Sequence, residues 1–274
     1  MSGIGDILTG AFAVGVLVGM VVAVRGVARS QVSAVAFGAC VIAYSCTVMT
    51  FAKLANTPPE PISVLDRMWG TITAIIAGCA LTGVVITTVR DRGHDRRSQQ
   101  WCMTVTLLGV LSATAVYYCL RPYAQLPPST DFLNDYAGQW RIDLYQCLFA
   151  AWIASPVGAL GIAAGRELHG PARWVTSAGG VTGVTWGIWK ITGVVWVGAL
   201  HRDHLPVASP VSVTLGVITL VLCVCGITLM GLQGWLHERQ RRVLYWRRRR
   251  RADRVFRSRG ATATAPLHDQ SRAL

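Results

Sequence analysis

Lys190 is the side chain whose position in this sequence most plainly requires a chemical partner. It lies within the apolar run 174–200, and no other charged residue lies so near the middle of an apolar run. A charged side chain at the centre of a bilayer costs about 2.5–3.5 kcal/mol on insertion scales, so it usually faces a partner or a cavity. The sequence therefore predicts a polar site around Lys190.

Further ionisable side chains lie at the ends of the neighbouring apolar runs. The topology derived below places these ends on the outer side of the membrane. These side chains are Lys53, Asp66, Arg67, Arg141 and Asp143. Together with Lys190 they would line a polar vestibule, open to the outside, that binds or gates a small ion or solute. In the structural alternative they are ordinary interface residues, and Lys190 extends its amine toward the surface or pairs with Asp143 or Asp66 to stabilise packing. The sequence leaves both interpretations open.

Two sets of glycines repeat every four residues inside apolar runs. They are Gly15 and Gly19 in the first run, and Gly179, Gly183 and Gly187 in the run that contains Lys190. Small residues at this spacing share a helix face and allow another helix backbone to approach closely in a membrane. We expect both sets to seat neighbouring helices of the same chain, with homodimerisation as the alternative.

No pattern typical of an enzyme site occurs in the chain. It contains no GxSxG, HExxH, P-loop or Rossmann fingerprint, and its six histidines are not grouped with acids or thiols at metal-ligand spacing. The eight cysteines fall inside apolar runs, where cysteine behaves as a small apolar residue. We therefore expect no catalytic residue, no metal, no cofactor and no disulfide framework.

Seven long apolar runs must position these side chains, at about residues 7–24, 32–52, 68–89, 101–120, 144–164, 174–200 and 211–232. Each is long enough to cross a hydrocarbon core of about 30 Å, and the absence of water there requires helices. Only 14% of the residues are charged, against about 25% in a soluble protein. The sequence thus predicts an all-α fold, a bundle of seven transmembrane helices over residues 1–236, with a kink at Pro156.

Basic residues predict the orientation of this bundle. Arginines concentrate in segments 25–29, 90–97 and 166–173 and in the C-terminal tail, whereas the alternate loops carry fewer basic residues and several acids. Because basic loops stay in the cytoplasm, we place the N-terminus outside and the C-terminus in the cytoplasm. The expected location is the cell membrane, crossed several times.

The segment 237–259 contributes much of the formal net charge of +13. Its densest arginines are Arg241, Arg242, Arg247, Arg248, Arg249, Arg250 and Arg251. Arginines that directly follow a span attract anionic lipids of the inner leaflet, at about 1 kcal/mol each, so we favour lipid anchoring over nucleic acid as the partner. Residues 260–274 have the composition of a disordered tail. A cytoplasmic protein partner for the tail remains the alternative.

Four segments together resemble an actinobacterial family of seven-helix integral membrane proteins regarded as transporters. They are DFLNDYAGQW before the fifth run, RELHGPARW after it, WGIWK in the sixth run and RRVLYWRRRR after the seventh. The resemblance implies a transporter, and we expect this chain to lack the cytoplasmic domain usual in that family. From residues and resemblance together we expect a transporter-like protein of unknown substrate, or alternatively a membrane sensor or scaffold that acts through its basic tail.

Overall fold

A computed structural model describes most of the chain up to residue 200 and nine residues beyond it. The described residues are 4–28, 32–55, 58–89, 96–136, 138–168 and 170–200, followed by 215, 216, 218, 219, 221, 222, 225, 226 and 229. The basic segment 237–259 and the tail 260–274 lie outside the described residues, and their predicted roles stay predictions.

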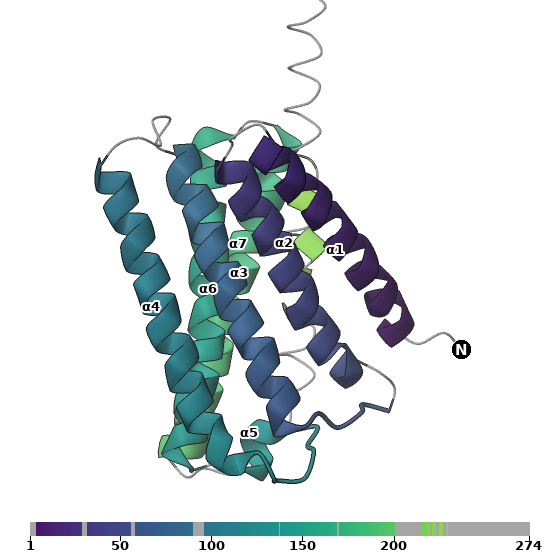
Figure 1. Cartoon of the computed structure of the whole chain (residues 1–274). Helices are drawn as coiled ribbons and strands as arrows, with labels where there is room; N and C mark the ends of the chain where they lie inside the picture. Colours follow the sequence, from purple (N-terminus) through teal and green to yellow (C-terminus); the bar gives the residue numbers. More distant parts are fainter. Residues whose placement is uncertain are drawn as a thin grey trace, which may run out of the picture. The chain divides into compact units, whose positions relative to one another are not determined.

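The described part of the chain is helical (Figure 1). Its α-helices are α1 (Ile4–Ala28), α2 (Val32–Phe51), α3 (Val64–Val89), α4 (Arg96–Leu120), α5 (Phe132–Asp135), α6 (Trp140–Glu167) and α7 (Pro171–Val194). Short helices follow three of them: η1 (Ala52–Ala55), η2 (Arg121–Tyr123) and the π-helix η3 (Val195–Ala199). The all-α prediction is confirmed for this part of the chain, and the long helices run up and down alternately.

Four of the described helical segments are long and apolar enough to cross a membrane. They are Ala34–Leu54, Val64–Ile86, Arg97–Tyr123 and Trp140–Arg166, and a shorter apolar helix spans Phe12–Ala28. α7 is not among them, because its many glycines and threonines lower its mean hydropathy. The prediction of an apolar, multi-helix membrane protein is therefore supported, while the number of seven spans and the orientation stay predictions.

Local sequence explains where two of these helices begin. The hydroxyl of Ser63 accepts a 3.1 Å hydrogen bond from the backbone N–H of Asp66, so Ser63 caps the N-terminus of α3. Gly170 has a φ of 70°, a conformation that favours glycine, and Pro171 follows as the first residue of α7. The two residues thus allow a tight turn from α6 into α7.

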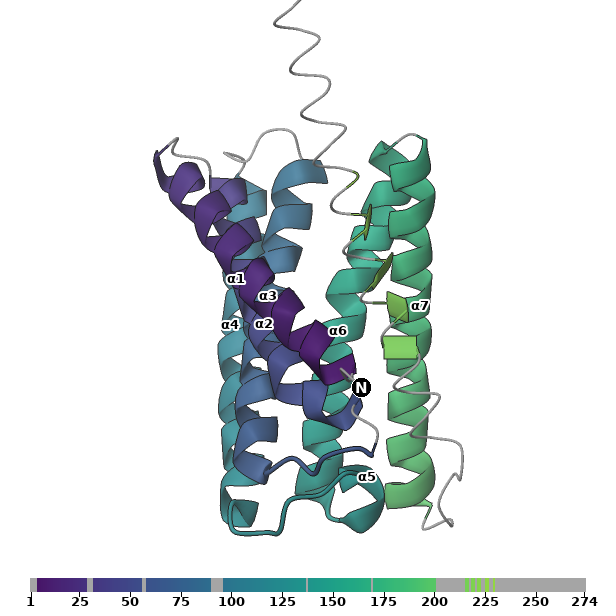
Figure 2. The ribbon, with the colours of Figure 1, turned by 90° about the vertical axis from the view of Figure 1, so that its right-hand side faces the viewer.

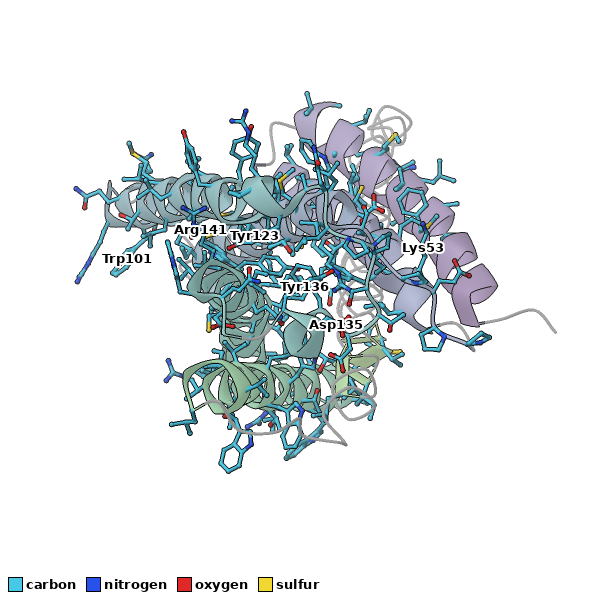
Figure 3. The ribbon with its side chains drawn as sticks, turned by 90° about the horizontal axis from the view of Figure 1, so that it is seen from below. Lys53, Trp101, Tyr123, Asp135, Tyr136 and Arg141 are labelled. Atoms are coloured by element: carbon cyan, nitrogen blue, oxygen red, sulfur yellow. The ribbon has the colours of Figure 1, made fainter. Side chains whose placement is uncertain are left out.

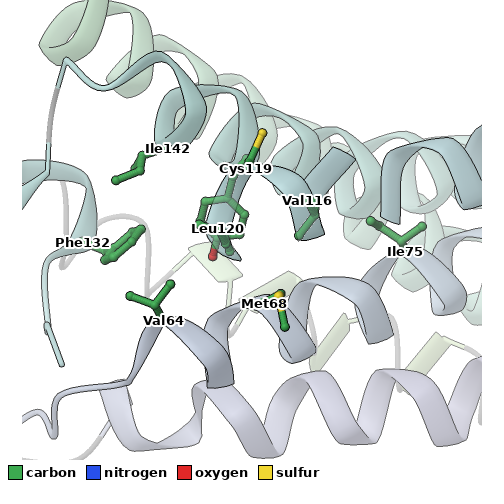
Figure 4. Packing of buried hydrophobic residues seen from close by; sticks show 9 residues of the cluster. Val64, Met68, Ile75, Val116, Cys119, Leu120, Phe132 and Ile142 are labelled. Atoms are coloured by element: carbon green, nitrogen blue, oxygen red, sulfur yellow. The ribbon is translucent and has the colours of Figure 1, made fainter. Parts of the chain in front are cut away.

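A cluster of buried hydrophobic side chains joins α3, α4, α5 and α6 toward the end of the bundle that carries α5 (Figure 4). It combines Val64, Met68 and Ile75 of α3 with Val116, Cys119 and Leu120 of α4, and with Phe132, Ile142 and Tyr145. At this end the loops are therefore held by buried side chains as well as by the chain connections.

The helices α6 and α7 lie side by side (Figure 2), and glycines bring their backbones into contact. A Cβ atom added at Gly180 would lie 2.6 Å from the Cα of Gly161, closer than real side chains approach. Two glycines of the predicted stripe also face neighbours: a Cβ at Gly183 would lie 2.6 Å from Val157, and one at Gly187 would press on Ala154. Gly179 is buried in the same helix.

The other predicted glycine pair lies against α2 of the same chain. A Cβ at Gly15 would lie 3.3 Å from the Cβ of Ser45, and one at Gly19 would lie 2.9 Å from the carbonyl oxygen of Gly38. In the seventh apolar run, a Cβ at Gly216 would lie 3.4 Å from the indole nitrogen of Trp186. The residues of this run that the structure describes, 215, 216, 218, 219, 221, 222, 225, 226 and 229, are helical.

The chain divides after Gly226 into two compact units, Met1–Gly226 and Ile227–Leu274. The sequence places the end of the membrane domain at residue 236. Of the second unit the structure describes only Leu229, so the domain boundaries stay predictions. The seven described cysteines form no disulfide with one another.

Pro156 is buried within α6, which continues to Glu167. Proline has no N–H, so the carbonyl of Trp152, one turn earlier, loses its usual partner in the helix. Gly78 of α3 packs against this carbonyl: a Cβ there would lie 2.6 Å from the oxygen of Trp152. The proline and the glycine thus define one contact between α3 and α6.

We expect Gly78→Ala to lower the free energy of unfolding by about 1–3 kcal/mol, because the added methyl meets a backbone atom that cannot move aside. Gly83→Ala on the same helix is the matched control, since a Cβ there meets nothing within 4 Å. The control should be neutral or slightly stabilising. Thermal unfolding in one detergent compares the two variants, and equal midpoints would contradict the contact.

Candidate functional site

Two loops at the α5 end of the bundle are joined to each other by backbone hydrogen bonds. The N–H of Ile62 donates to the carbonyl of Ser129 at 3.0 Å, and the N–H of Ser129 donates to Ile62 at 3.2 Å. The N–H of Glu60 also donates to the carbonyl of Lys53 at 3.0 Å. The loop before α3 and the loop after α4 therefore form one cap over this end.

Arg67 reaches from α3 into this cap and is only 6% exposed. Its Nη2 donates a 2.6 Å hydrogen bond to the carbonyl oxygen of Ser129. The guanidinium lies 4.9 Å from the centre of the Phe132 ring, within the range of a cation–π interaction. The side chain thus ties α3 to α5 through both a hydrogen bond and an aromatic face.

Tyr145 of α6 lies on another side of the same guanidinium. Its hydroxyl is within hydrogen-bonding range of both Arg67 and Thr71, and Thr71 donates to the carbonyl of Arg67 at 2.8 Å. Tyr145 and Thr71 are buried at 3% and 0% exposure. Three buried polar side chains therefore meet in the interior between α3 and α6.

Two acids complete the electrostatics of this cluster. Asp131 and Asp135 both lie close enough to attract the charge of Arg67, and Asp135 accepts a short hydrogen bond from the hydroxyl of Ser129. The N–H of Asp135 also donates to the carbonyl of Asp131 at 3.0 Å. The two carboxylates of the turn that carries α5 thus attract the guanidinium of Arg67.

Lys190 of α7 is partly buried and faces the same electrostatic environment. It lies near enough to Asp131 to be attracted by the carboxylate and near enough to Arg67 to be repelled by the guanidinium. Lys190 and Arg67 are therefore two cations that share an acidic neighbour. We call Arg67, Thr71, Asp131, Tyr145 and Lys190 the Arg67 cluster.

One buried polar atom of this cluster has no hydrogen-bond partner among the described residues. It is Nε of Arg67. Nearly all buried polar groups in proteins have a hydrogen-bond partner, so each exception requires an explanation. A ligand or ordered water that accepts from Nε of Arg67 would satisfy this group.

The energetics of Arg67 point in the same direction. The residue lies in the first turn of α3, where the positive end of the helix dipole disfavours a cation. It also lies within the apolar segment Val64–Ile86, where a charge is costly and in most cases functional. A guanidinium has five N–H donors, and Nε is still available to an acceptor.

The other residues of the predicted vestibule lie at the same end but face different directions. Viewed from that end, Lys53 and Arg141 lie on opposite sides, with Asp135 between them (Figure 3). Lys53 and Asp66 are exposed, and Arg141 lies beside Trp140 with its guanidinium 5.4 Å from the ring centre. Their grouping with Lys190 in one vestibule stays a prediction.

Asp143 packs against η3 after α7. A Cβ added at Gly198 would lie 2.8 Å from the carboxyl carbon of Asp143, so only glycine leaves room for the carboxylate there. This contact joins the start of α6 to the end of α7. Lys190 lies two turns earlier on α7, away from that contact.

Arg67 is the central residue that the predicted binding set omits, although it belongs to the wider group of ionisable residues. A signal for it exists in the sequence, because residues 64, 67, 68, 71, 75 and 78 recur at helical spacing. All six positions are buried in α3. The arginine thus replaces an apolar residue on the packing face of its helix, while Asp66 occupies the exposed face.

Comparison with protein-family models, with curated proteins and with solved structures gives no match for this chain. Within the described residues, no three histidine, cysteine or acidic side chains group as metal ligands. The assignment of a function therefore depends on the geometry of the Arg67 cluster.

Proposed function

We propose that this chain is a multi-pass protein of the cell membrane that binds a small anionic solute at the Arg67 cluster, as the binding step of transport. The observation that carries this proposal is the buried Arg67, whose Nε lacks a partner among the described residues while Lys190 lies nearby. A carboxylate or phosphate oxygen is the acceptor that guanidinium and ammonium donors bind best. The predicted topology would open the cluster to the outside.

The four apolar segments support the membrane environment of this proposal. The proposed kinship with the actinobacterial transporter family, based on DFLNDYAGQW and three other segments, agrees with it. The alternative is a sensor or scaffold, in which Arg67 only joins α3 to the loops of the cap and binds no solute. The hydrogen bond from Arg67 to Ser129 favours that alternative, because it joins α3 to the cap without any ligand.

Lys190 separates the two functions experimentally. We expect Lys190→Met to insert and fold at least as well as the unmodified chain, because an uncharged side chain of similar length removes the cost of burying an ammonium. We also expect it to reduce solute binding about tenfold or more, since one charge-assisted hydrogen bond is lost. Uptake into proteoliposomes, measured with a panel of labelled carboxylates and organic phosphates, reads out binding and transport.

Lys190→Ala and Lys190→Arg complete this test. Alanine should impair uptake more than folding, and arginine should retain part of the uptake because it keeps the charge. If alanine abolished expression while methionine restored both expression and uptake, Lys190 would serve packing alone. Absence of uptake for the whole panel by the unmodified chain would favour the sensor or scaffold.

A further inference from the structure

A second polar site lies on a different flank of the same bundle end, between α4 and α6. A pocket of about 340 Å³ is lined by Tyr118, Cys119, Arg121, Pro122, Trp140 and Arg141. Two of the six side chains are arginines, and none is acidic. Because the two guanidiniums come from different elements, η2 and α6, the fold itself brings two positive charges to one pocket.

Asp143 is only two residues from Arg141 but is not among the residues that line this pocket. Residues two apart on a helix point about 200° apart, and the carboxylate of Asp143 packs against Gly198 of η3. The Arg141 guanidinium lies instead 5.4 Å from the ring centre of its neighbour Trp140. With two arginines and no acid in its lining, the pocket is suited to an anion.

Aromatic side chains frame both arginines. The Arg121 guanidinium lies 5.5 Å from the ring centre of Tyr117, and Tyr118 and Trp140 are 65% and 67% exposed. Arg121 and Trp140 lie at the ends of two apolar segments that could cross a membrane. Tyrosine and tryptophan gather at such ends, at the level of the lipid headgroups.

An exposed apolar surface leads along α4 away from this pocket. Its large side chains are Met103, Leu107, Leu108, Val110 and Leu111, each more than half exposed. In a membrane such a surface is covered by acyl chains. A single molecule with an anionic head and hydrocarbon tails would thus match both the pocket and the helix face beside it.

We propose that the pocket between Arg121 and Arg141 binds the phosphate of an anionic phospholipid, with its acyl chains along α4. The two guanidiniums bind the phosphate oxygens, and Trp140 and Tyr118 contact the glycerol region. This site shares no residue with the Arg67 cluster, and neither proposal depends on the other.

The test uses the full chain in nanodiscs that contain phosphatidylglycerol at increasing fractions in phosphatidylcholine. Retention of phosphatidylglycerol on the purified protein is measured by native mass spectrometry. Two arginine contacts of the strength typical near a charged membrane predict a preference of about 30-fold for phosphatidylglycerol. We expect the double variant R121Q/R141Q to lower this preference to about twofold. Each single variant should lower the preference by a factor of about five.

Arg173→Gln is the matched control, because Arg173, like Arg141, lies beside a tryptophan, with its guanidinium 5.6 Å from the ring centre of Trp174. It lies at the start of α7, at the other end of the bundle, and should leave the preference unchanged. An unchanged preference in the double variant would overturn the proposal. So would an equal effect of Arg173→Gln, because the attraction would then be distributed over the whole surface.

Two further arms keep the result decisive. Inorganic phosphate, added at millimolar concentration, should compete only weakly, and full displacement of the lipid by it would show that the pocket binds free anions. If the double variant does not fold, R121K/R141K keeps both charges but loses the planar forks, and should retain a preference above that of either single glutamine variant. A lysine pair with no preference would contradict charge-driven lipid binding.

Discussion

Arg67→Met is expected to remove solute binding almost completely while leaving the chain folded. Arg67 provides the buried donors of the cluster, and each hydrogen bond to a charged group contributes about 1.5–3 kcal/mol. Loss of two such bonds to a ligand corresponds to a decrease in affinity of about 100-fold or more. In the fold, methionine loses the bond to Ser129 but also removes a buried charge, and these two effects offset each other.

Arg67→Lys should give the opposite order of effects. The ammonium keeps the charge, so part of the solute binding should persist. Its single charged centre cannot hold the Ser129 carbonyl, the Phe132 ring and a ligand in the geometry of a planar guanidinium. A buried charge with fewer partners is destabilising, so we expect this variant to unfold at a lower temperature than Arg67→Met.

The measurable result is that solute binding and thermal stability rank the Arg67 variants in different orders. Binding should decrease from arginine to lysine to methionine, whereas thermal stability should be lowest for lysine. Isothermal titration with the solute found in the uptake panel and thermal unfolding in the same detergent provide both series. Arg173→Met, in the first turn of α7, is the control and should change neither. Equal loss of stability and binding in Arg67→Met would indicate that Arg67 only holds the fold together and does not bind a ligand.

Gly180→Ala is expected to have the largest effect on stability, about 3 kcal/mol or more. The new methyl would lie 2.6 Å from the Cα of Gly161 and 3.2 Å from its nitrogen. Both are backbone atoms within a helix, so the only relief is separation of α6 from α7, which also opens the contacts of Gly183 and Gly187. Overpacking of this kind costs at the upper end of the usual range of about 1–3 kcal/mol.

Gly165→Ala on α6 provides the matched control. A Cβ there would lie 3.4 Å from the hydroxyl of Ser177, which is ordinary contact with a side chain. The higher helix propensity of alanine should make this variant neutral or more stable by up to about 1 kcal/mol. Thermal unfolding of both variants checks the prediction, and a Gly180→Ala protein as stable as the control would show that α6 and α7 do not cross at these glycines.

Most of the helical fold follows from the sequence, because a membrane requires long apolar runs to form helices. The expected starts were less accurate: α3 begins at Val64 and α6 at Trp140, each about four residues before the apolar run. In both cases the first turn carries an arginine and an aspartate, which hydropathy treats as loop. The cap at Ser63 is the local signal that marks the true start of α3.

The site was harder to predict, because sequence position near a helix end does not fix direction. Asp66 and Arg67 are adjacent, but about 100° of helix rotation makes one exposed and the other buried. Arg141 and Asp143 likewise face different flanks of α6. Helical spacing could have separated these residues, whereas the approach of Ser129 and Phe132 to Arg67 depends on the folding of a loop, which no periodicity reveals.

The paired hydrogen bonds between Ile62 and Ser129 have a consequence for any motion of this molecule. They couple the segment that leads into α3 with the segment that leaves α4, and Arg67 fastens the same carbonyl from inside. A displacement of either segment must carry the other with it. If this end of the bundle moves, the two segments would therefore move together as one rigid unit. Spin labels placed on both segments would then keep a constant separation during that movement.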